Sequence, residues 1–154
     1  MKKYLLPVLF ILLAPAFAVA QSATVQEVTE TILESTRYLN ENMTGMPGSY
    51  SSEGALEFWS SGGLLNEVTD RDADEFESVR TAVKHIRVIP LVEGQAAVAH
   101  FYSEGTMKPK GFPGVSHYLT RASQVFVKEG GKWVVRSSHW SPVAAGSGTS
   151  QTVQ

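Results

Sequence analysis

The sequence of 154 residues contains no cysteine. Disulfide bonds, thiol catalysis and zinc or iron–sulfur sites with cysteine ligands are therefore excluded. The sequence also lacks an excess of charge, because its formal net charge is −2 and it has no basic run. Such a balance provides no electrostatic attraction for nucleic acid or for an anionic membrane surface, so we expect neither as a partner.

The apolar run at the N-terminus is too short for a comfortable transmembrane helix. Met1-Lys2-Lys3 is basic, residues 5–17 are apolar but interrupted by two prolines, and Ala18-Val19-Ala20 has the small-x-small form of a cleavage site. We interpret residues 1–20 as a cleaved signal peptide of a bacterial periplasmic or secreted protein, with an uncleaved anchor as the alternative. After cleavage we expect no stable membrane insertion.

The rest of the chain fits one globular domain with its own core. Hydrophobic residues make up 43% of the sequence and charged residues 18%, a composition that gives no sign of disorder. We place this domain at residues 21–145. The last residues, 146–154, are small and polar and are predicted to form a disordered tail.

Helices are predicted in the first half of the domain. Apolar residues recur at helical spacing over 24–41, with glutamates between them. A short helix is predicted over 73–82, with Asp70 or Asp72 as its cap. Residues 55–68 are interpreted as two short strands around a Ser-Gly-Gly turn, and a helix over the first part of this segment is the alternative.

The second half of the domain is predicted to form an antiparallel sheet. Four runs rich in β-branched and aromatic residues, 83–92, 95–104, 116–128 and 132–143, are separated by turn-forming residues. Helices followed by a series of strands indicate an α+β fold in which the helices cover one face of the sheet.

The pair Gly130-Gly131 is predicted to close a two-residue hairpin. Val127 then lies opposite Val134, and Ala122 lies opposite His139. Because residues two apart share a face, one face carries Tyr118, Thr120, Ala122, Gln124, Phe126, Trp133, Val135, Ser137 and His139. The opposite face carries His117, Leu119, Arg121, Val125, Val127, Val134, Arg136 and Trp140.

Both faces of the predicted sheet are partly apolar, and the helices of so short a chain can cover only one of them. A turn at Glu93-Gly94 pairs Arg87 with His100 and His85 with Tyr102. We therefore predict that the uncovered face packs on a second copy of the chain and forms a homodimer. The side chains assigned to this interface are His85, Arg87, His100, Arg121, Arg136 and Trp140.

One histidine falls in each of the four long predicted strands, a distribution that calls for a test of a metal site. His117 and His139 are predicted to face opposite ways, and no HxH or HxxxH spacing occurs. His85 and His100 share a face, but Arg87 lies between them and disfavours a cation. We interpret the histidines as structural or interface residues and expect neither a metal nor a cofactor.

Three segments together resemble the nuclear transport factor 2-like (NTF2-like) superfamily. They are the small-residue strand Ala96-Ala97-Val98-Ala99, the run "VFVKEGGKW" over 125–133, and the closing His139-Trp140-Ser141-Pro142. More narrowly, the chain resembles SnoaL-like domains and the association domain of calcium/calmodulin-dependent kinase II. The resemblance covers residues 24–145 and is strongest after Val83.

The resemblance implies a cystatin-like cone, in which a strongly curved antiparallel sheet wraps around N-terminal helices. It also implies a pocket inside the cone and dimerisation through the outer surface of the sheet. The arginines that line the pocket of the association domain match Ser103 and Gln124 here, and neither is charged. His139 matches a histidine in the last strand of that family.

Three functions follow from these observations. The first is binding of a small, mostly apolar ligand by Trp59, Phe101, Ser103, Tyr118, Gln124, Phe126, Ser137 and His139. The second is an isomerase, cyclase or dehydratase in which His139 acts as general acid or base, with Tyr118 or Tyr102 polarising a carbonyl. Glu57 is the one plausible carboxylate, and we expect it to be exposed. The third function is a purely structural assembly module.

Overall fold

One helix, α1 (Ala23–Asn42), precedes all the strands of the domain. Ser22 caps its first turn by accepting a hydrogen bond from the backbone N–H of Val25, and Met43 ends it in the left-handed conformation. Val28 and Ile32 lie one turn apart and are buried. The predicted helix over 24–41 is therefore confirmed to within a residue at each end.

The computed structural model describes residues 22–69, 75–143, 146 and 148. The predicted signal peptide, and the predicted tail except for Gly146 and Gly148, lie outside these residues. So do Asp70 and Asp72. No helix in the described part of the chain is both long and apolar enough to cross a membrane.

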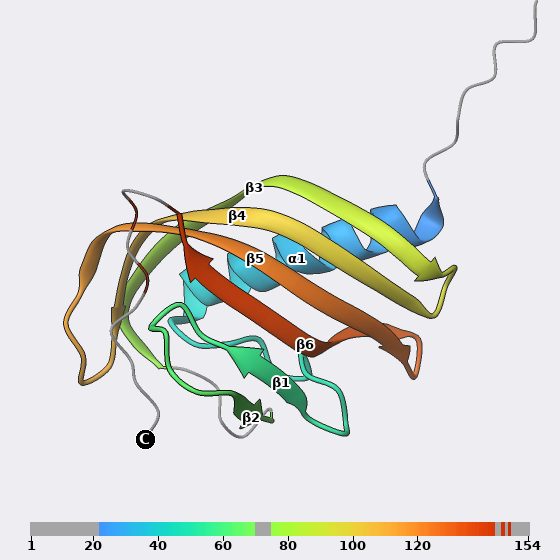
Figure 1. The fold of residues 1–154 in the computed structure, drawn as a ribbon, viewed down its shortest axis with the longest axis horizontal. Helices are drawn as coiled ribbons and strands as arrows, with labels where there is room; N and C mark the ends of the chain where they lie inside the picture. The colour runs from blue at the N-terminus through green and yellow to red at the C-terminus, as the bar shows by residue number, and fades with distance from the viewer. Residues whose placement is uncertain (1–21, 70–74, 144–145, 147, 149–154) are drawn as a thin grey trace, which may run out of the picture.

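Six strands form one mixed sheet (Figure 1). They are β1 (Ala55–Phe58), β2 (Asn66–Val68), β3 (Phe76–Val92), β4 (Ala96–Pro109), β5 (Val115–Glu129) and β6 (Lys132–Pro142). Their order in the sheet is β2-β1-β6-β5-β4-β3, with β1 parallel to β6 and every other pair antiparallel. The prediction of two strands in 55–68 is confirmed, whereas the expectation of a wholly antiparallel sheet is wrong at the β1–β6 pair.

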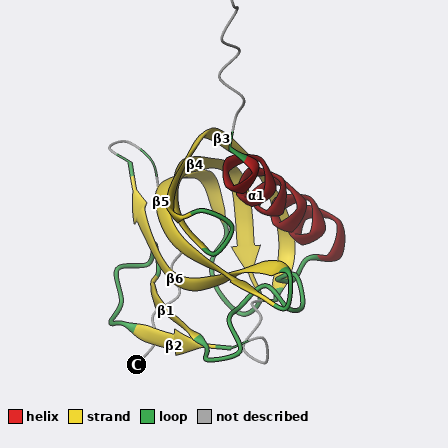
Figure 2. Ribbon diagram, turned by 90° about the vertical axis from the view of Figure 1, so that its right-hand side faces the viewer, coloured by secondary structure: helices red, strands yellow, loops and turns green. Residues whose placement is uncertain are grey.

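The long strands curl around α1, which packs mainly against β3 (Figure 2). Two clusters of buried side chains lie between the helix and the concave face. The larger cluster contains Val28, Ile32, Phe101 and Phe126, and the smaller one is built around Met107 and its neighbours Val79 and Tyr118. This arrangement of one helix in a curved sheet agrees with the cone implied by the resemblance.

The predicted second helix over 73–82 is wrong, because residues 76–82 form the first part of β3. Val79 and Thr81 are buried, while Arg80 between them and Ser78 and Ala82 on either side are exposed. This alternation has the period of a strand and not of a helix. The described part of the domain therefore holds a single helix, and pairing with β4 overrides the helical propensity of this segment.

The hairpin between β5 and β6 has the predicted two-residue loop, in which Gly130 and Gly131 both have positive φ (55° and 84°). The predicted register holds as far as the pair Phe126–Val135 and is then shifted by one residue. Val125 pairs with Ser137, which leaves Arg136 as the extra residue of a β-bulge.

The bulge reverses the facing of every later residue in β6. Ala122 lies opposite Trp140, where the simple register placed His139. Ser138 and Trp140 consequently face the interior, and Ser137 and His139 face outward. The sequence-based assignment of these four residues is therefore wrong.

A second bulge lies in β3, where His85 has a positive φ of 55°. Arg87 pairs with His100 as predicted, but Tyr102 pairs with Lys84 and not with His85. The rings of His85 and Tyr102 still form a T-shaped pair, with their centroids 6.0 Å apart and their planes at 88°.

Candidate functional site

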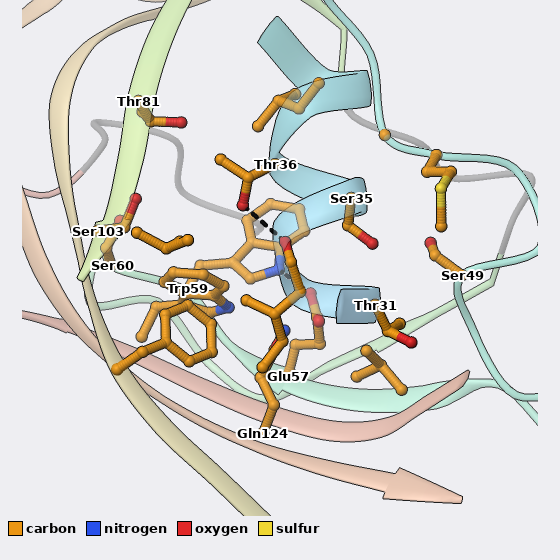
Figure 3. Close-up of a pocket in the computed structure, with 18 of the residues that line it drawn as sticks. Thr31, Ser35, Thr36, Ser49, Glu57, Trp59, Ser60, Thr81, Ser103 and Gln124 are labelled. Carbon is orange, nitrogen blue, oxygen red and sulfur yellow. Dashed lines mark hydrogen bonds between the residues drawn. The ribbon is translucent and has the colours of Figure 1, made fainter. Parts of the chain in front are cut away.

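A cavity of about 220 Å³ lies between α1 and the concave face of the sheet. Its wall draws on both buried clusters, which meet around it. Figure 3 shows polar side chains entering the cavity from both sides, with Thr31 and Thr36 on α1 and Ser103 and Gln124 on the sheet. The cone is therefore hollow and not completely filled by its aromatic residues.

Aromatic side chains form much of the cavity wall. They come from β3, β4, β5, β6 and the segments on either side of β1, and they are Tyr50, Trp59, Phe76, Phe101, Tyr118, Phe126 and Trp140. Phe101 and Trp140 meet edge to face, with centroids 5.5 Å apart at 83°. The described lining residues include no lysine, arginine, histidine or aspartate, and Glu57 is the only acidic residue among them.

Glu57 is placed in the cavity by the alternation of β1. Ala55 and Glu57 point inward and are buried, whereas Leu56 and Phe58 point outward and are exposed. Only 5% of the surface of Glu57 is exposed. The prediction that this residue is exposed is therefore wrong, because β1 lies inside the sheet between β2 and β6.

Three neutral donors bind the carboxylate of Glu57. The hydroxyl of Ser138 donates to Oε1 at 2.5 Å, and the indole Nε1–H of Trp59 donates to Oε2 at 3.0 Å. The hydroxyl of Tyr50 is the third donor. Burial raises the pKa of Glu57 above its usual value, and these three hydrogen bonds offset part of that rise because they favour the ionised form.

The β6 bulge is what brings Ser138 to this carboxylate. Glu57 and Ser138 are register partners in the parallel β1–β6 pair, and the shift at Arg136 turns Ser138 inward. Without the bulge Ser138 would face solvent, and the carboxylate would lose its hydrogen bond at 2.5 Å. Sequence reasoning could have found Glu57 from its alternation with Ala55, but not its partner Ser138.

Six of the eight predicted ligand-binding residues line the cavity, and they are Trp59, Phe101, Ser103, Tyr118, Gln124 and Phe126. The other two do not. The hydroxyl of Ser137 donates to the carbonyl oxygen of Leu56. His139 is exposed on the convex face, where its ring lies 5.6 Å from that of Phe58. Glu57 and Trp140 line the cavity but were not among the predicted ligand-binding residues.

The residues predicted for the interface do not all share one face. His85, Arg87, His100 and Arg121 are exposed on the convex side. Arg136 folds back over the bulge and donates to the carbonyl oxygen of Gly54 at 3.0 Å. Trp140 lines the cavity instead. The placement of Trp140 on the outer face is therefore wrong, again because of the bulge.

Polar contacts tie neighbouring strands together on the convex face. The Nδ1 atom of His100 lies 2.9 Å from the hydroxyl of Ser123, and Arg121 Nε–H donates to the hydroxyl of Ser141 at 2.9 Å.

In the described part of the chain, no three histidine, aspartate or glutamate side chains cluster as a metal-ligand set would require.

No protein-family model matches the chain, and no curated protein matches it in sequence. Solved structures do match it. An NTF2-like protein of unknown function from Pseudomonas putida KT2440 has 17% identity and a TM-score of 0.55, covering 77% of this chain and 86% of that one. A candidate scytalone dehydratase from Novosphingobium aromaticivorans has 13% identity and a TM-score of 0.60, covering 85% and 89%.

A third match is an NTF2-like protein of unknown function from Prochlorococcus, at 18% identity and a TM-score of 0.51, covering 85% of this chain and 97% of that one. Identities this low establish the fold and no more. Together with the observed cone, these matches show that the chain has the NTF2-like fold.

Proposed function

We propose that this chain, an NTF2-like domain, binds a small and mostly apolar organic molecule inside its cone. The observation that carries the proposal is the cavity of about 220 Å³ between α1 and the sheet. Apolar and aromatic walls with a few placed polar groups are typical of small-molecule sites. Here the polar groups include Glu57, Ser103 and Gln124.

The cavity volume limits the size of the ligand. Pockets for drug-sized ligands usually measure about 300–1,000 Å³, and an engineered apolar cavity of about 150 Å³ binds benzene. A cavity of about 220 Å³ therefore fits a molecule of roughly ten non-hydrogen atoms, such as a single substituted ring.

Filling the cavity tests this proposal. Ser103→Leu adds volume to the wall from β4, and Ser123→Leu, on the exposed face of β5, is the matched control. Native mass spectrometry of purified protein detects co-purified ligand, and the fluorescence of Trp59 and Trp140 reports binding of single-ring compounds. We expect Ser103→Leu to abolish binding and Ser123→Leu to retain it. Equal binding by both variants would contradict a site inside the cone, and a folded wild type that binds no single-ring compound would favour a purely structural assembly module.

A second candidate function is proton-transfer catalysis of the isomerase, cyclase or dehydratase type, with Glu57 as the general acid or base. The burial of Glu57 in the cavity wall favours it, because a carboxyl group in an apolar site has its pKa raised toward neutrality. His139, the residue first considered for this role, lies on the convex face and away from the cavity. Base-catalysed ring opening of 5-nitrobenzisoxazole tests the reactivity of Glu57, and equal rates for the wild type and Glu57→Gln would exclude it as the base.

The convex face of the sheet is proposed to bind a second copy of the chain. Tyr102, beside Arg121, is 43% exposed there, and Phe58, beside His139, is 45% exposed. Tyrosine and arginine are frequent interface anchors. Light scattering tests this with Tyr102→Glu, which we expect to be monomeric. Leu64→Glu, in the exposed loop between β1 and β2, should leave the dimer intact. A monomeric wild type would refute the proposal.

Export is proposed from the N-terminal sequence alone. Expression of the full chain in a bacterium, followed by mass measurement of the periplasmic fraction, should give a protein that begins at Gln21. A protein that keeps its first residues in the membrane fraction would instead support an uncleaved anchor.

A further inference from the structure

We infer that the ligand of the cone is a small organic cation, a primary or quaternary ammonium compound, which pairs with Glu57 and packs against the aromatic wall. This inference rests on the proposed ligand-binding function and specifies the charge of the ligand. It follows from the charge, the hydrogen-bonding character and the aromatic content of the cavity.

The charge of the cavity has one sign. The titratable groups that line it are Glu57 and the phenols of Tyr50 and Tyr118. Nearby basic groups on the surrounding strands are engaged elsewhere, because Arg136 binds Gly54 and Glu53, and Lys128 binds Glu27. An ionised Glu57 therefore has no cationic partner in the described cavity wall, and a bound cation would supply it.

The donors that already contact Glu57 do not neutralise it. Ser138, Trp59 and Tyr50 are uncharged, so they orient the carboxylate and leave its negative charge in place. A carboxylate has about four lone-pair positions, and three donors leave one for an ammonium N–H. A quaternary ammonium group needs no lone pair and requires only the charge.

The helix side of the cavity also offers acceptors. The hydroxyl of Thr31 donates its hydrogen to the carbonyl oxygen of Glu27, and that of Thr36 donates to the carbonyl oxygen of Ile32, each at 2.9 Å. Both side chains line the cavity (Figure 3). Their hydrogens are engaged within the helix, so the oxygens present lone pairs, which suit a hydrogen-bond donor or a positive charge.

The aromatic wall completes a site for a cation. The faces of tryptophan, tyrosine and phenylalanine rings carry negative potential and attract ammonium groups, most strongly where water is excluded. Trp59 and Trp140 line the same cavity as Glu57, together with Phe101 and Tyr118. A neutral apolar ligand would use the rings but would leave a buried carboxylate without a counter-ion.

The titration of Glu57 gives the expected pH dependence. Burial raises its pKa, so the carboxyl group becomes protonated at a higher pH than an exposed glutamate would. The cation pairs with the ionised form only. Affinity for a cation should therefore rise as the pH increases through the pKa of Glu57, whereas affinity for a neutral ligand should not.

Isosteric pairs of probes test the inference by titration calorimetry. Choline and 3,3-dimethylbutan-1-ol have the same shape but differ in charge, and benzylammonium and benzyl alcohol form a second pair. At about pH 8, where the carboxyl group is more fully ionised, we expect at least one cation to bind roughly tenfold more tightly than its neutral partner. Glu57→Gln should abolish that difference. Glu67→Gln, the same substitution at an exposed position on β2, should preserve it.

The possible results separate this inference from the proposed function. Neutral probes that bind as well as the cations would overturn the inference and leave ligand binding supported. Folded protein that binds none of the four probes would count against both. If Glu57→Gln does not fold, the wild-type protein provides the test, since cation affinity that is independent of pH would also overturn the inference.

Discussion

Ser138→Ala provides a sharp test of the site, because it removes one hydroxyl and nothing else from the carboxylate of Glu57. The Ser138–Glu57 hydrogen bond measures 2.5 Å, within the range of charge-assisted bonds, and both residues are buried. Hydrogen bonds to charged groups contribute about 1.5–3 kcal/mol, and neutral ones contribute about 0.5–1.5 kcal/mol. We therefore expect Ser138→Ala to lower the free energy of unfolding by about 1.5–3 kcal/mol where Glu57 is ionised.

The loss should depend on pH in a defined direction. The hydroxyl of Ser138 stabilises the ionised form of Glu57, so its removal raises the pKa of that group further. At a pH below the pKa of Glu57 the carboxyl group is protonated in both proteins, and the loss falls to about 0.5–1.5 kcal/mol. The destabilisation caused by Ser138→Ala should therefore grow as the pH rises through the pKa of Glu57.

Urea unfolding at several pH values measures this effect. Thermal unfolding provides a second measurement, since each kcal/mol lost from the free energy of unfolding lowers the Tm of a domain of this size by about 2–4 °C. Ser137→Ala is the matched control, since its hydroxyl binds only the carbonyl oxygen of Leu56 on the other face. A loss that is equal for the two variants, or that does not change with pH, would refute the inward placement of Ser138.

Three further predictions concern the buried carboxylate, a close backbone contact and the displaced histidine. Glu57→Gln should stabilise the protein relative to the wild type increasingly as the pH rises, because the wild type ionises a buried group whose pKa is raised by folding; a constant difference in urea unfolding from acid to neutral pH would contradict this. Gly105→Ala should cost roughly 1–3 kcal/mol or more, since φ is 147° and a Cβ atom would lie 2.0 Å from the carbonyl oxygen of Arg80. Gly94→Ala is the control, because a Cβ atom at that position meets nothing within 4 Å, and it should lose less stability. A lower Tm for Gly94→Ala than for Gly105→Ala would contradict the prediction. His139→Ala should leave ligand affinity in calorimetry unchanged, because the side chain is exposed on the convex face, and a tenfold loss would contradict this placement.

The cavity wall was largely predictable where a strand keeps a simple period of two. Ser103 on β4 and Gln124 and Phe126 on β5 line the cavity as predicted. Their strands alternate without interruption beside them, so local pattern and global facing agree. The hairpin at Gly130-Gly131 was predictable for the same reason, because two residues with positive φ are a local requirement that glycine meets.

The error in β6 has a tertiary cause. Val135 exchanges backbone hydrogen bonds with Ser49 and Ser51, and two residues later β6 pairs with β1 instead. The bulge at Arg136 lies where the strand changes partner along this edge. The side chain of Arg136 binds the carbonyl oxygen of Gly54 just before β1. These contacts join segments about eighty residues apart, and no local pattern in β6 records them.

The sequence by itself therefore determined the helix, the long strands and the β5–β6 hairpin, because these depend on local periodicity and turn chemistry. The outline of an NTF2-like cone came from the resemblance of three short segments to that superfamily. The tertiary structure decided which side chains of β6 face the cavity. A one-residue bulge reverses the facing of all later residues. It places His139 on the convex face and Ser138 beside Glu57. The candidate acid–base group of the site is therefore the buried carboxylate of Glu57 and not the imidazole of His139.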